Sequence, residues 1–299
     1  MHRWRRGRRT RSGDRLAMQT IGVIGTGTMG CGIAQIAAQA RCQVILQNRR
    51  QESVEQGIRT IKRSLEVLVS KERITAAQSE GTLERIRGVV SLEDLKLCDI
   101  VIESAPEIEE LKVELFRKLD SILNEDCVIA TNTSSLSVTK LAQSVSRPGH
   151  FIGMHFFNPV AVMKLVEVVS GLRTTDSTVS VVRELAEKLG KLPIDVKDYP
   201  GFVVNRVLFP MINEAAFALQ EGVADAKGID ECMKGGCNHP MGPLAIADLV
   251  GLDVVHAILE SLYREYGNPR YAPCLGITKR VEAGWLGRKT GRGFYDYGM

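Results

Sequence analysis

The sequence predicts an α/β fold, with a mostly parallel sheet covered by helices on both faces and an all-helical C-terminal domain after it. Three observations lead to this prediction. Short β-branched, apolar runs alternate with helical patterns up to about residue 200, where the strand-like runs stop. A glycine-rich turn joins the first of these runs to a helix within residues 20–30. With 299 residues, the chain is also long enough for two domains with separate cores.

The first strand leads into a G-x-G-x-x-G turn formed by Gly25, Gly27 and Gly30, with Thr28 and Met29 inside it. Gly25 permits a tight turn, Gly27 lets the backbone approach a pyrophosphate, and Gly30 lets the helix pack closely on the strand. The N-terminus of the helix presents free N–H groups to phosphates. We therefore predict a Rossmann-type dinucleotide-binding domain and expect these five residues to contact the cofactor.

The other elements follow in order along the chain. Further strands are expected at residues 43–46, 99–102, 127–130, 151–154, 165–169 and 193–196. Helices are expected at residues 109–123, 177–189, 202–221, 226–235, 243–266 and 277–284, with a helical hairpin between residues 53 and 87. The strand signals end near Pro200. We therefore place the dinucleotide-binding domain at residues 18–200 and the helical domain at residues 201–299.

Positive charge is concentrated at the N-terminus. The formal charge is +4, but residues 1–17 hold seven arginines and one aspartate, which leaves −2 for the rest of the chain. A nearly neutral body does not attract nucleic acid. The basic segment has the charge of a nucleic-acid arm or a transit peptide, yet it has almost no apolar residues and precedes an internal Met18. We therefore interpret residues 1–17 as a disordered tail or an extended translation start.

Composition predicts a cytoplasmic protein. The hydrophobic and charged fractions, 44% and 25%, are those of an ordinary globular protein. The chain contains no run of about 18 or more apolar residues, the length that spans a membrane. The seven cysteines show neither C-x-x-C pairs nor the spacing of zinc ligands, which indicates a reducing compartment. We therefore expect no metal, and neither nucleic acid nor a membrane as a partner.

A histidine and a glutamate on two successive strand-like segments carry the predicted chemistry. His155 follows one segment, and Glu167 lies inside the next. If the two strands pair, the carboxylate can hold the imidazole in one tautomer and raise its basicity, as a general base requires. A strand-end histidine is often only structural, but a buried carboxylate needs a partner. Ser134 follows another strand at the sheet edge where ligands bind, although a serine there also suits a helix N-cap.

Several segments occur in an order that is shared with a known family. They are the glycine turn and residues 131–136 (TNTSSL), 155–159 (HFFNP), 163–167 (MKLVE), 200–206 (PGFVVNR), 240–244 (PMGPL), 248–253 (DLVGLD) and 287–295 (GRKTGRGFY). From about residue 18 to residue 297 the chain resembles the 3-hydroxyacyl-CoA dehydrogenases, and is most similar to the bacterial 3-hydroxybutyryl-CoA dehydrogenases. The resemblance implies an NAD(P)-dependent oxidoreductase of fatty-acid or butanoate metabolism. Its reaction would interconvert (S)-3-hydroxyacyl-CoA, such as 3-hydroxybutanoyl-CoA, and 3-oxoacyl-CoA.

The resemblance also implies roles for individual residues. His155 is the expected general base for the 3-hydroxyl proton, with Glu167 orienting it, while Ser134 and Asn205 hold the substrate oxygens. Further cofactor contacts are expected from Glu107, Lys112, Asn132, Asn158 and Lys279, and coenzyme A contacts from Ser64, Lys71 and Ser134. The resemblance also implies a homodimer formed through the helical domain.

The end of the second strand departs from the family pattern. Where an aspartate normally binds the ribose hydroxyls of NAD, this chain has Asn48, followed by Arg49 and Arg50. Losing a repulsive carboxylate and gaining guanidinium groups favours a 2′-phosphate, so we predict NADP, or use of both NADP and NAD. The alternative is that both arginines face solvent and Asn48 serves the hydroxyls of NAD. A second departure is Gly235, which replaces a packing leucine and is expected to loosen a helix.

Two other functions are compatible with parts of this pattern. The β-hydroxyacid dehydrogenases share a similar glycine turn, but their base is a lysine on the interdomain helix, whereas this chain offers His155 and Glu167. A non-catalytic protein of the same fold, as in the lens crystallins that resemble this family, has no need of a base, its orienting partner and two oxygen-holding residues. The prediction is therefore an enzyme.

Overall fold

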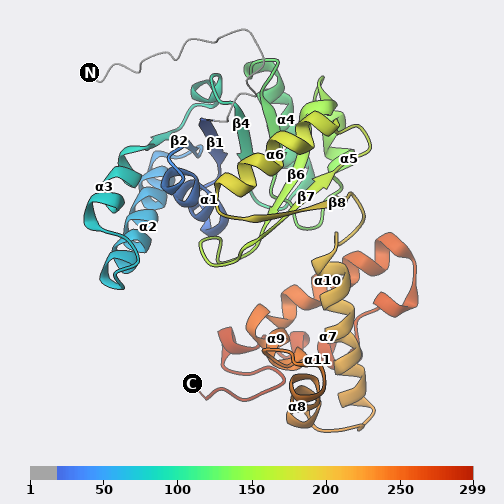
Figure 1. Cartoon of the computed structure of the whole chain (residues 1–299). Coiled ribbons are helices and arrows are strands. Elements are labelled where there is room, and N and C mark those ends of the chain that lie inside the picture. Colours follow the sequence, from blue (N-terminus) through green and yellow to red (C-terminus); the bar gives the residue numbers. More distant parts are fainter. Residues whose placement is uncertain (1–18, 299) are drawn as a thin grey trace.

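The computed structural model describes residues 19–298, and their first part builds an eight-stranded sheet (Figure 1). The strands are β1 (Thr20–Ile24), β2 (Gln43–Gln47), β3 (Ile86–Val89), β4 (Ile100–Glu103), β5 (Val128–Thr131), β6 (Phe151–Phe156), β7 (Leu165–Ser170) and β8 (Leu192–Lys197). They lie in the order β3-β2-β1-β4-β5-β6-β7-β8, and every neighbouring pair is parallel except β6 and β7. The carboxyl ends of β1 to β6 therefore lie along one edge of the sheet.

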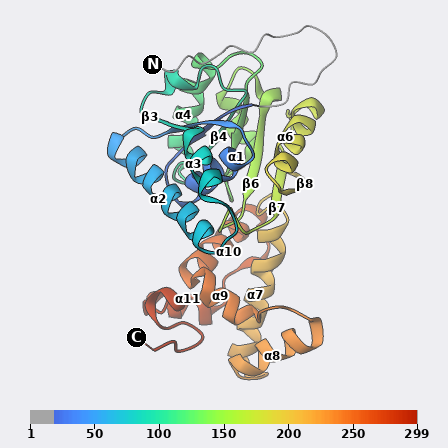
Figure 2. The ribbon, with the colours of Figure 1, turned by 60° about the vertical axis from the view of Figure 1, so that its left-hand side comes forward.

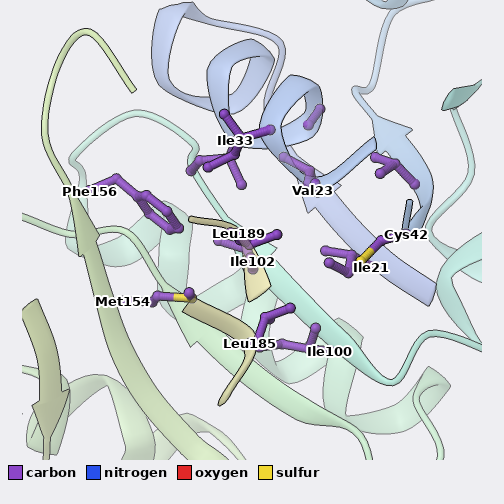
Figure 3. Packing of buried hydrophobic residues seen from close by; sticks show 14 of the residues in the cluster. Ile21, Val23, Ile33, Cys42, Ile100, Ile102, Met154, Phe156, Leu185 and Leu189 are labelled. Atoms are coloured by element: carbon purple, nitrogen blue, oxygen red, sulfur yellow. The ribbon is translucent and has the colours of Figure 1, made fainter. Parts of the chain in front are cut away.

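Helices cover both faces of this sheet. They are α1 (Thr28–Gln39), α2 (Gln51–Ser70), α3 (Ala76–Glu84), α4 (Glu109–Ile122), α5 (Val138–Leu141) and α6 (Asp176–Lys188). Apolar residues of α1, α2 and α6 pack on one face, and those of α4 and α5 on the other. Figure 3 shows the core on the face that α1, α2 and α6 cover. Ile33 of α1 and Leu185 of α6 belong there to one buried cluster with the strand residues Ile21, Ile102 and Met154. Two buried faces explain why the central strands are apolar almost throughout.

The predicted fold class is confirmed, with one strand missed. All the expected strands are present, and the expected helical hairpin is α2 followed by α3. The hairpin ends earlier than predicted, however, because residues 86–89 form β3 at the edge of the sheet. Arg87 in this strand is exposed, and Gly88 has no side chain. The strand therefore lacks the apolar run by which the buried strands were identified.

The second part of the chain is helical, and Figures 1 and 2 both show it below the sheet. Its helices are α7 (Val204–Gln220), α8 (Ala226–Cys237), α9 (Pro243–Val250), α10 (Leu252–Tyr266) and α11 (Leu275–Glu282), and α7, α9, α10 and α11 enclose a core of their own. The single helix predicted for residues 243–266 is wrong, because Gly251 adopts a φ of 105° and divides it into α9 and α10. The replacement at Gly235 does not interrupt α8, and a Cβ built there would meet no atom within 4 Å among the described residues.

The two parts are joined by a short segment after β8. Gly201 and Phe202 in this segment have positive φ values of 77° and 48°, which turn the chain into α7. Phe202 belongs to the buried cluster on the α4–α5 face of the sheet, although it stands next to the helical domain. Within residues 19–298 there is no helix long and apolar enough to cross a membrane. The basic segment of residues 1–17 lies outside the described residues.

Candidate active site

The glycine turn leaves room for a phosphate-bearing ligand. Gly25 has a φ of 103°, and a Cβ built on it would lie 2.4 Å from the carbonyl oxygen of Ser104. A Cβ on Gly30 would lie 2.0 Å from the carbonyl oxygen of Gly25, whereas one on Gly27 would meet no atom of the described chain within 4 Å. Gly27 is also the N-cap of α1 and provides no capping side chain. The turn therefore fits a dinucleotide, with two glycines required by packing and the third facing open space.

The predicted base and its partner face each other in the sheet. β6 and β7 pair so that His155 lies opposite Glu167, and His155 Nδ1 is 2.7 Å from Glu167 Oε2. Both side chains are buried, with residue exposures of 6% and 1%. The other oxygen, Oε1, accepts hydrogen bonds from the N–H groups of Val203 and Val204 at 3.0 and 2.9 Å. Because Glu167 engages Nδ1, the imidazole is left to exchange a proton through Nε2.

The Ser134 loop is held from both domains. Glu107 Oε1 accepts hydrogen bonds from the backbone N–H groups of Ser134 and Ser135 at 2.9 and 3.1 Å, and from the Ser135 hydroxyl at 3.0 Å. From α7, Asn205 Nδ2 donates to the carbonyl oxygen of Ser134 at 3.3 Å. The structure therefore brings Ser134 and Asn205 together, while α7 also contacts the His155–Glu167 pair through its first residues.

A buried lysine lies beneath this loop. The Lys112 ammonium bridges both carboxylate oxygens of Glu103 at 2.8 and 2.9 Å and also reaches Glu107 Oε2 at 3.1 Å. Burial by itself would raise the pKa of Glu107, but the Lys112 charge and hydrogen bonds from Thr133 and Ser134 hold that pKa below its usual range. Lys112 is only 1% exposed, so in this arrangement it supports Glu107 rather than facing a ligand directly.

Sequence reasoning did not find Glu103. It is fully buried at the end of β4 and accepts hydrogen bonds from Lys112, the Thr131 hydroxyl and the Ala105 N–H group. The available signal was a carboxylate at the end of an apolar strand. Such a residue needs a partner in the folded protein.

Asn132 lies at the carboxyl edge of the sheet, where the structure gives it a bridging position. Its Oδ1 accepts a hydrogen bond from the Phe156 N–H at 2.8 Å, and its Nδ2 donates to the Ser104 hydroxyl at 3.4 Å. Asn158 is exposed just beyond β6 and precedes a cis peptide bond to Pro159. Both asparagines thus lie close to the end of the strand that carries His155.

Comparison with known proteins identifies the family. The model of the NAD-binding domain of 3-hydroxyacyl-CoA dehydrogenases matches residues 20–199, and the model of their C-terminal domain matches residues 201–297. The chain belongs to the 3-hydroxyacyl-CoA dehydrogenase family. The family predicted from the ordered motifs is thereby confirmed, together with an NAD-binding domain and dehydrogenase function.

Related proteins match this chain over nearly its whole length. The 3-hydroxybutyryl-CoA dehydrogenase of Clostridioides difficile is 48% identical over 277 residues, which are 93% of this chain and 99% of that protein. The probable 3-hydroxybutyryl-CoA dehydrogenase of Deinococcus radiodurans shows the same identity and the same two coverages. Among solved structures, the (S)-3-hydroxybutyryl-CoA dehydrogenase of Ralstonia eutropha has a TM-score of 0.92 and 51% identity, and the match covers 94% of this chain and 100% of that one.

In this 3-hydroxyacyl-CoA dehydrogenase, the end of β2 is more exposed to solvent than the His155–Glu167 pair. Asn48 Nδ2 donates to the Thr26 hydroxyl at 2.9 Å. Next to it lies a cavity of about 610 Å³, lined by Thr26, Gly27, Arg50, Glu52, Ser53 and Gln56. Of the two arginines, Arg50 lines this cavity. Arg49 instead lies within electrostatic range of Glu114 on α4, whose pKa is lowered by Lys118 and, more weakly, by Arg49.

Three further expected ligand contacts lie on α2, directly after α2 and on α11 of the dehydrogenase. Ser64 is half-buried on α2, and Lys71 is exposed directly after that helix. Lys279 is on α11 of the helical domain, where its ammonium pairs with Glu282 at 2.7 Å. Their roles toward coenzyme A and the cofactor stay predictions.

Proposed function

We propose that the chain interconverts (S)-3-hydroxyacyl-CoA and 3-oxoacyl-CoA, with 3-hydroxybutanoyl-CoA as its substrate and His155 as the general base. The observation that carries this proposal is the buried pair of His155 and Glu167, 2.7 Å apart on adjacent strands. Its second support is the contact of Asn205 with the Ser134 loop, because these two residues would hold the substrate oxygens. A base and two neighbouring hydrogen-bonding groups are what hydride removal from an alcohol carbon requires.

The proposed proton path follows from this geometry. A nicotinamide, when bound, supplies the hydride acceptor. His155 Nε2 accepts the proton of the 3-hydroxyl group, and Glu167 stabilises the resulting imidazolium through the Nδ1–H hydrogen bond. The Ser134 hydroxyl and the Asn205 amide hold the substrate oxygen during the transfer. In the reverse direction the imidazolium returns the proton to the oxygen of the 3-oxo group.

A spectrophotometric assay tests the reaction. Purified protein, acetoacetyl-CoA and the reduced cofactor should give a loss of absorbance at 340 nm that depends on all three components. Turnover of a free β-hydroxy acid with no turnover of acetoacetyl-CoA would instead support the β-hydroxyacid dehydrogenases. Absence of turnover with either substrate would favour a non-catalytic protein of the same fold.

For the cofactor, we propose NADP, or both NADP and NAD. Asn48 is neutral where a carboxylate would repel a 2′-phosphate, and Arg50 lines the adjoining cavity. Glu52 lines the same cavity and opposes this preference. Glu107, Asn132 and Asn158 would contact the cofactor further along the sheet edge. Comparing kcat/KM for NADPH and NADH decides the question, because an NADH advantage of roughly tenfold or more would overturn the proposal.

Coenzyme A binding at Ser64 and Lys71, and a homodimer formed through the helical domain, complete the proposal. The dimer is supported by large apolar side chains that are exposed on this domain, among them Val207 at 65%, Leu249 at 53% and Leu275 at 63%. Sedimentation equilibrium should give twice the chain mass of 32.9 kDa. A single-chain mass at micromolar concentration would contradict the dimer. The cytoplasmic location stays a prediction from composition.

A further inference from the structure

Phe202 is unusually placed for a residue at the boundary of a helical domain. It is 5% exposed and belongs to the same buried cluster as Val138, Val169 and Val196 of the sheet domain. Its N–H group donates to the carbonyl oxygen of Tyr199 at 2.9 Å. An aromatic ring of the segment that joins the two domains thus packs inside the domain that carries His155 and Glu167.

The Phe202 ring packs against the proposed base. Its centroid lies 5.6 Å from the centroid of the His155 imidazole, with an interplanar angle of 59°. The Phe157 ring also contacts the imidazole, at 4.5 Å and 51°. Rings at these distances restrict rotation of the imidazole, which must keep Nδ1 on Glu167 if Nε2 is to face the substrate.

The backbone of Phe202 acts on the other member of the pair. A φ of 48° is uncommon for a residue other than glycine, and it turns the chain sharply at this point. The next two residues, Val203 and Val204, then donate their N–H groups to Glu167 Oε1 at 3.0 and 2.9 Å. Those two bonds fix the carboxylate while its second oxygen holds the imidazole.

We infer that Phe202 is a positioning residue for the base, because its ring packs against His155 and its backbone conformation directs two N–H donors to Glu167. The inference rests on the proposed function, in which His155 exchanges the substrate proton. Phe202 itself acts only through these two residues. The orientation of the base therefore depends on the chain segment that leads into α7.

Two substitutions distinguish the contribution of the Phe202 ring from that of its backbone conformation. Phe202→Gly removes the ring but readily adopts a positive φ, whereas Phe202→Leu keeps apolar bulk and the conformational constraint while losing the aromatic contact. We expect both to lower kcat for acetoacetyl-CoA reduction, by roughly 10- to 100-fold for Phe202→Gly and less for Phe202→Leu. KM for acetoacetyl-CoA should change by less than about twofold, because the substrate contacts are retained. If the glycine variant does not fold, the leucine variant still provides the test.

A spectroscopic readout distinguishes positioning from general destabilisation. The Nδ1–H proton of His155, hydrogen-bonded to Glu167, should give a downfield proton NMR resonance that is absent from His155→Ala. In both Phe202 variants we expect this resonance to shift or to broaden through exchange with water. The matched control is Phe209→Leu, because Phe209 is buried in the core of the helical domain and belongs to a different cluster. This control should lower Tm and leave the resonance unchanged.

Wild-type kcat together with an unchanged resonance in both Phe202 variants would overturn the inference. So would a loss of kcat that only parallels a loss of Tm, with the resonance intact as in Phe209→Leu. His155→Ala distinguishes this failure from failure of the proposed function. If His155→Ala turns over normally, the proposed base is wrong; if it is inactive while the Phe202 variants are normal, only the positioning role of Phe202 is refuted.

Discussion

The His155–Glu167 pair and the end of β2 belong to one sheet edge but are built in opposite ways. The pair is buried. One oxygen of Glu167 contacts His155 Nδ1, and the other accepts hydrogen bonds from the N–H groups of Val203 and Val204. At the end of β2, Arg49 and Arg50 are exposed, and one side-chain bond ties Asn48 to Thr26. A change in the pair leaves a buried polar group without its partner, whereas a change at Arg49 or Arg50 alters a side chain that is already exposed to solvent. Under the proposed function, the reaction therefore depends on a buried pair, while the cofactor preference depends on side chains at the end of β2 that can change with little cost to the fold.

The largest effect is expected at the buried base. His155→Ala should lower kcat for acetoacetyl-CoA by roughly 10²–10⁴-fold, because no group then exchanges the substrate proton. Cofactor affinity should be nearly unchanged, because the glycine turn that is expected to bind the cofactor lies between β1 and α1 and does not include His155. Steady-state kinetics and a fluorescence titration with the reduced cofactor measure the two quantities. Near-wild-type turnover in this variant would refute the assigned base.

Glu167→Gln tests the partner of the base with little change in shape. An amide retains an oxygen that can accept from Val203 and Val204, but it removes the negative charge beside the imidazole. We expect kcat to fall by about 10²-fold or more, because the imidazolium loses its stabilisation. The same assay applies, and a loss below about threefold would show that orientation by the charged carboxylate is unnecessary.

The Lys112 network allows a buried pair and an exposed pair to be compared on one helix. Lys112→Met leaves the buried Glu103 carboxylate without its cation, and breaking a buried ion pair costs about 3–5 kcal/mol of unfolding free energy. Lys118→Met is the matched control on α4, because its pairing with Glu114 is largely exposed and such pairs contribute about 0–1 kcal/mol. Denaturant unfolding measures both. Equal losses in the two variants would contradict the assigned role of burial.

The two arginines at β2 provide a smaller and more specific test. Arg50 lines the cavity beside Gly27, while Arg49 does not line it. We therefore expect Arg50→Ala to lower kcat/KM for NADPH by roughly tenfold and to leave NADH little changed, because one guanidinium–phosphate contact is lost. Arg49→Ala serves as the control and should have a smaller effect. A larger effect at Arg49 would show that the phosphate lies on the α4 side of the turn.

Removing residues 1–17 should have the smallest effect. This segment adds charge but almost no apolar side chains, the groups whose burial stabilises a folded protein. A protein that starts at Met18 is expected to retain kcat, Tm and its cofactor preference. Activity and thermal unfolding of the two lengths check this, and a loss of activity in the shorter form would assign the segment a function.

The sequence predicted the elements whose signals are local. The strand–turn–helix at Gly25 and the alternation of strands and helices depend on neighbouring residues, and both are present in the structure. His155 and Glu167 were matched because consecutive strands commonly pair. The family resemblance, rather than any pattern of spacing, supplied Asn205, which contacts a loop 71 positions earlier in the chain.

What was missed depends on contacts between distant segments. Glu103 is satisfied by Lys112 and Thr131 from two other elements, so its role was not visible along the chain. The division at Gly251 arises from a backbone φ of 105°, whereas the apolar pattern continues across it. Arg49 and Arg50 are adjacent in sequence, and only the structure shows which of them reaches the cavity.

The most direct test of the separation between reaction and cofactor choice is one kinetic comparison on Asn48→Asp/Arg50→Ala. This variant introduces a carboxylate for the ribose hydroxyls and removes the cation at the cavity. With acetoacetyl-CoA, we expect the ratio of kcat/KM for NADPH to that for NADH to fall by roughly tenfold or more, while kcat with saturating NADH stays within about twofold of wild type. An unchanged ratio together with a loss of kcat for both cofactors would contradict the separation, because the end of β2 would then serve the reaction itself.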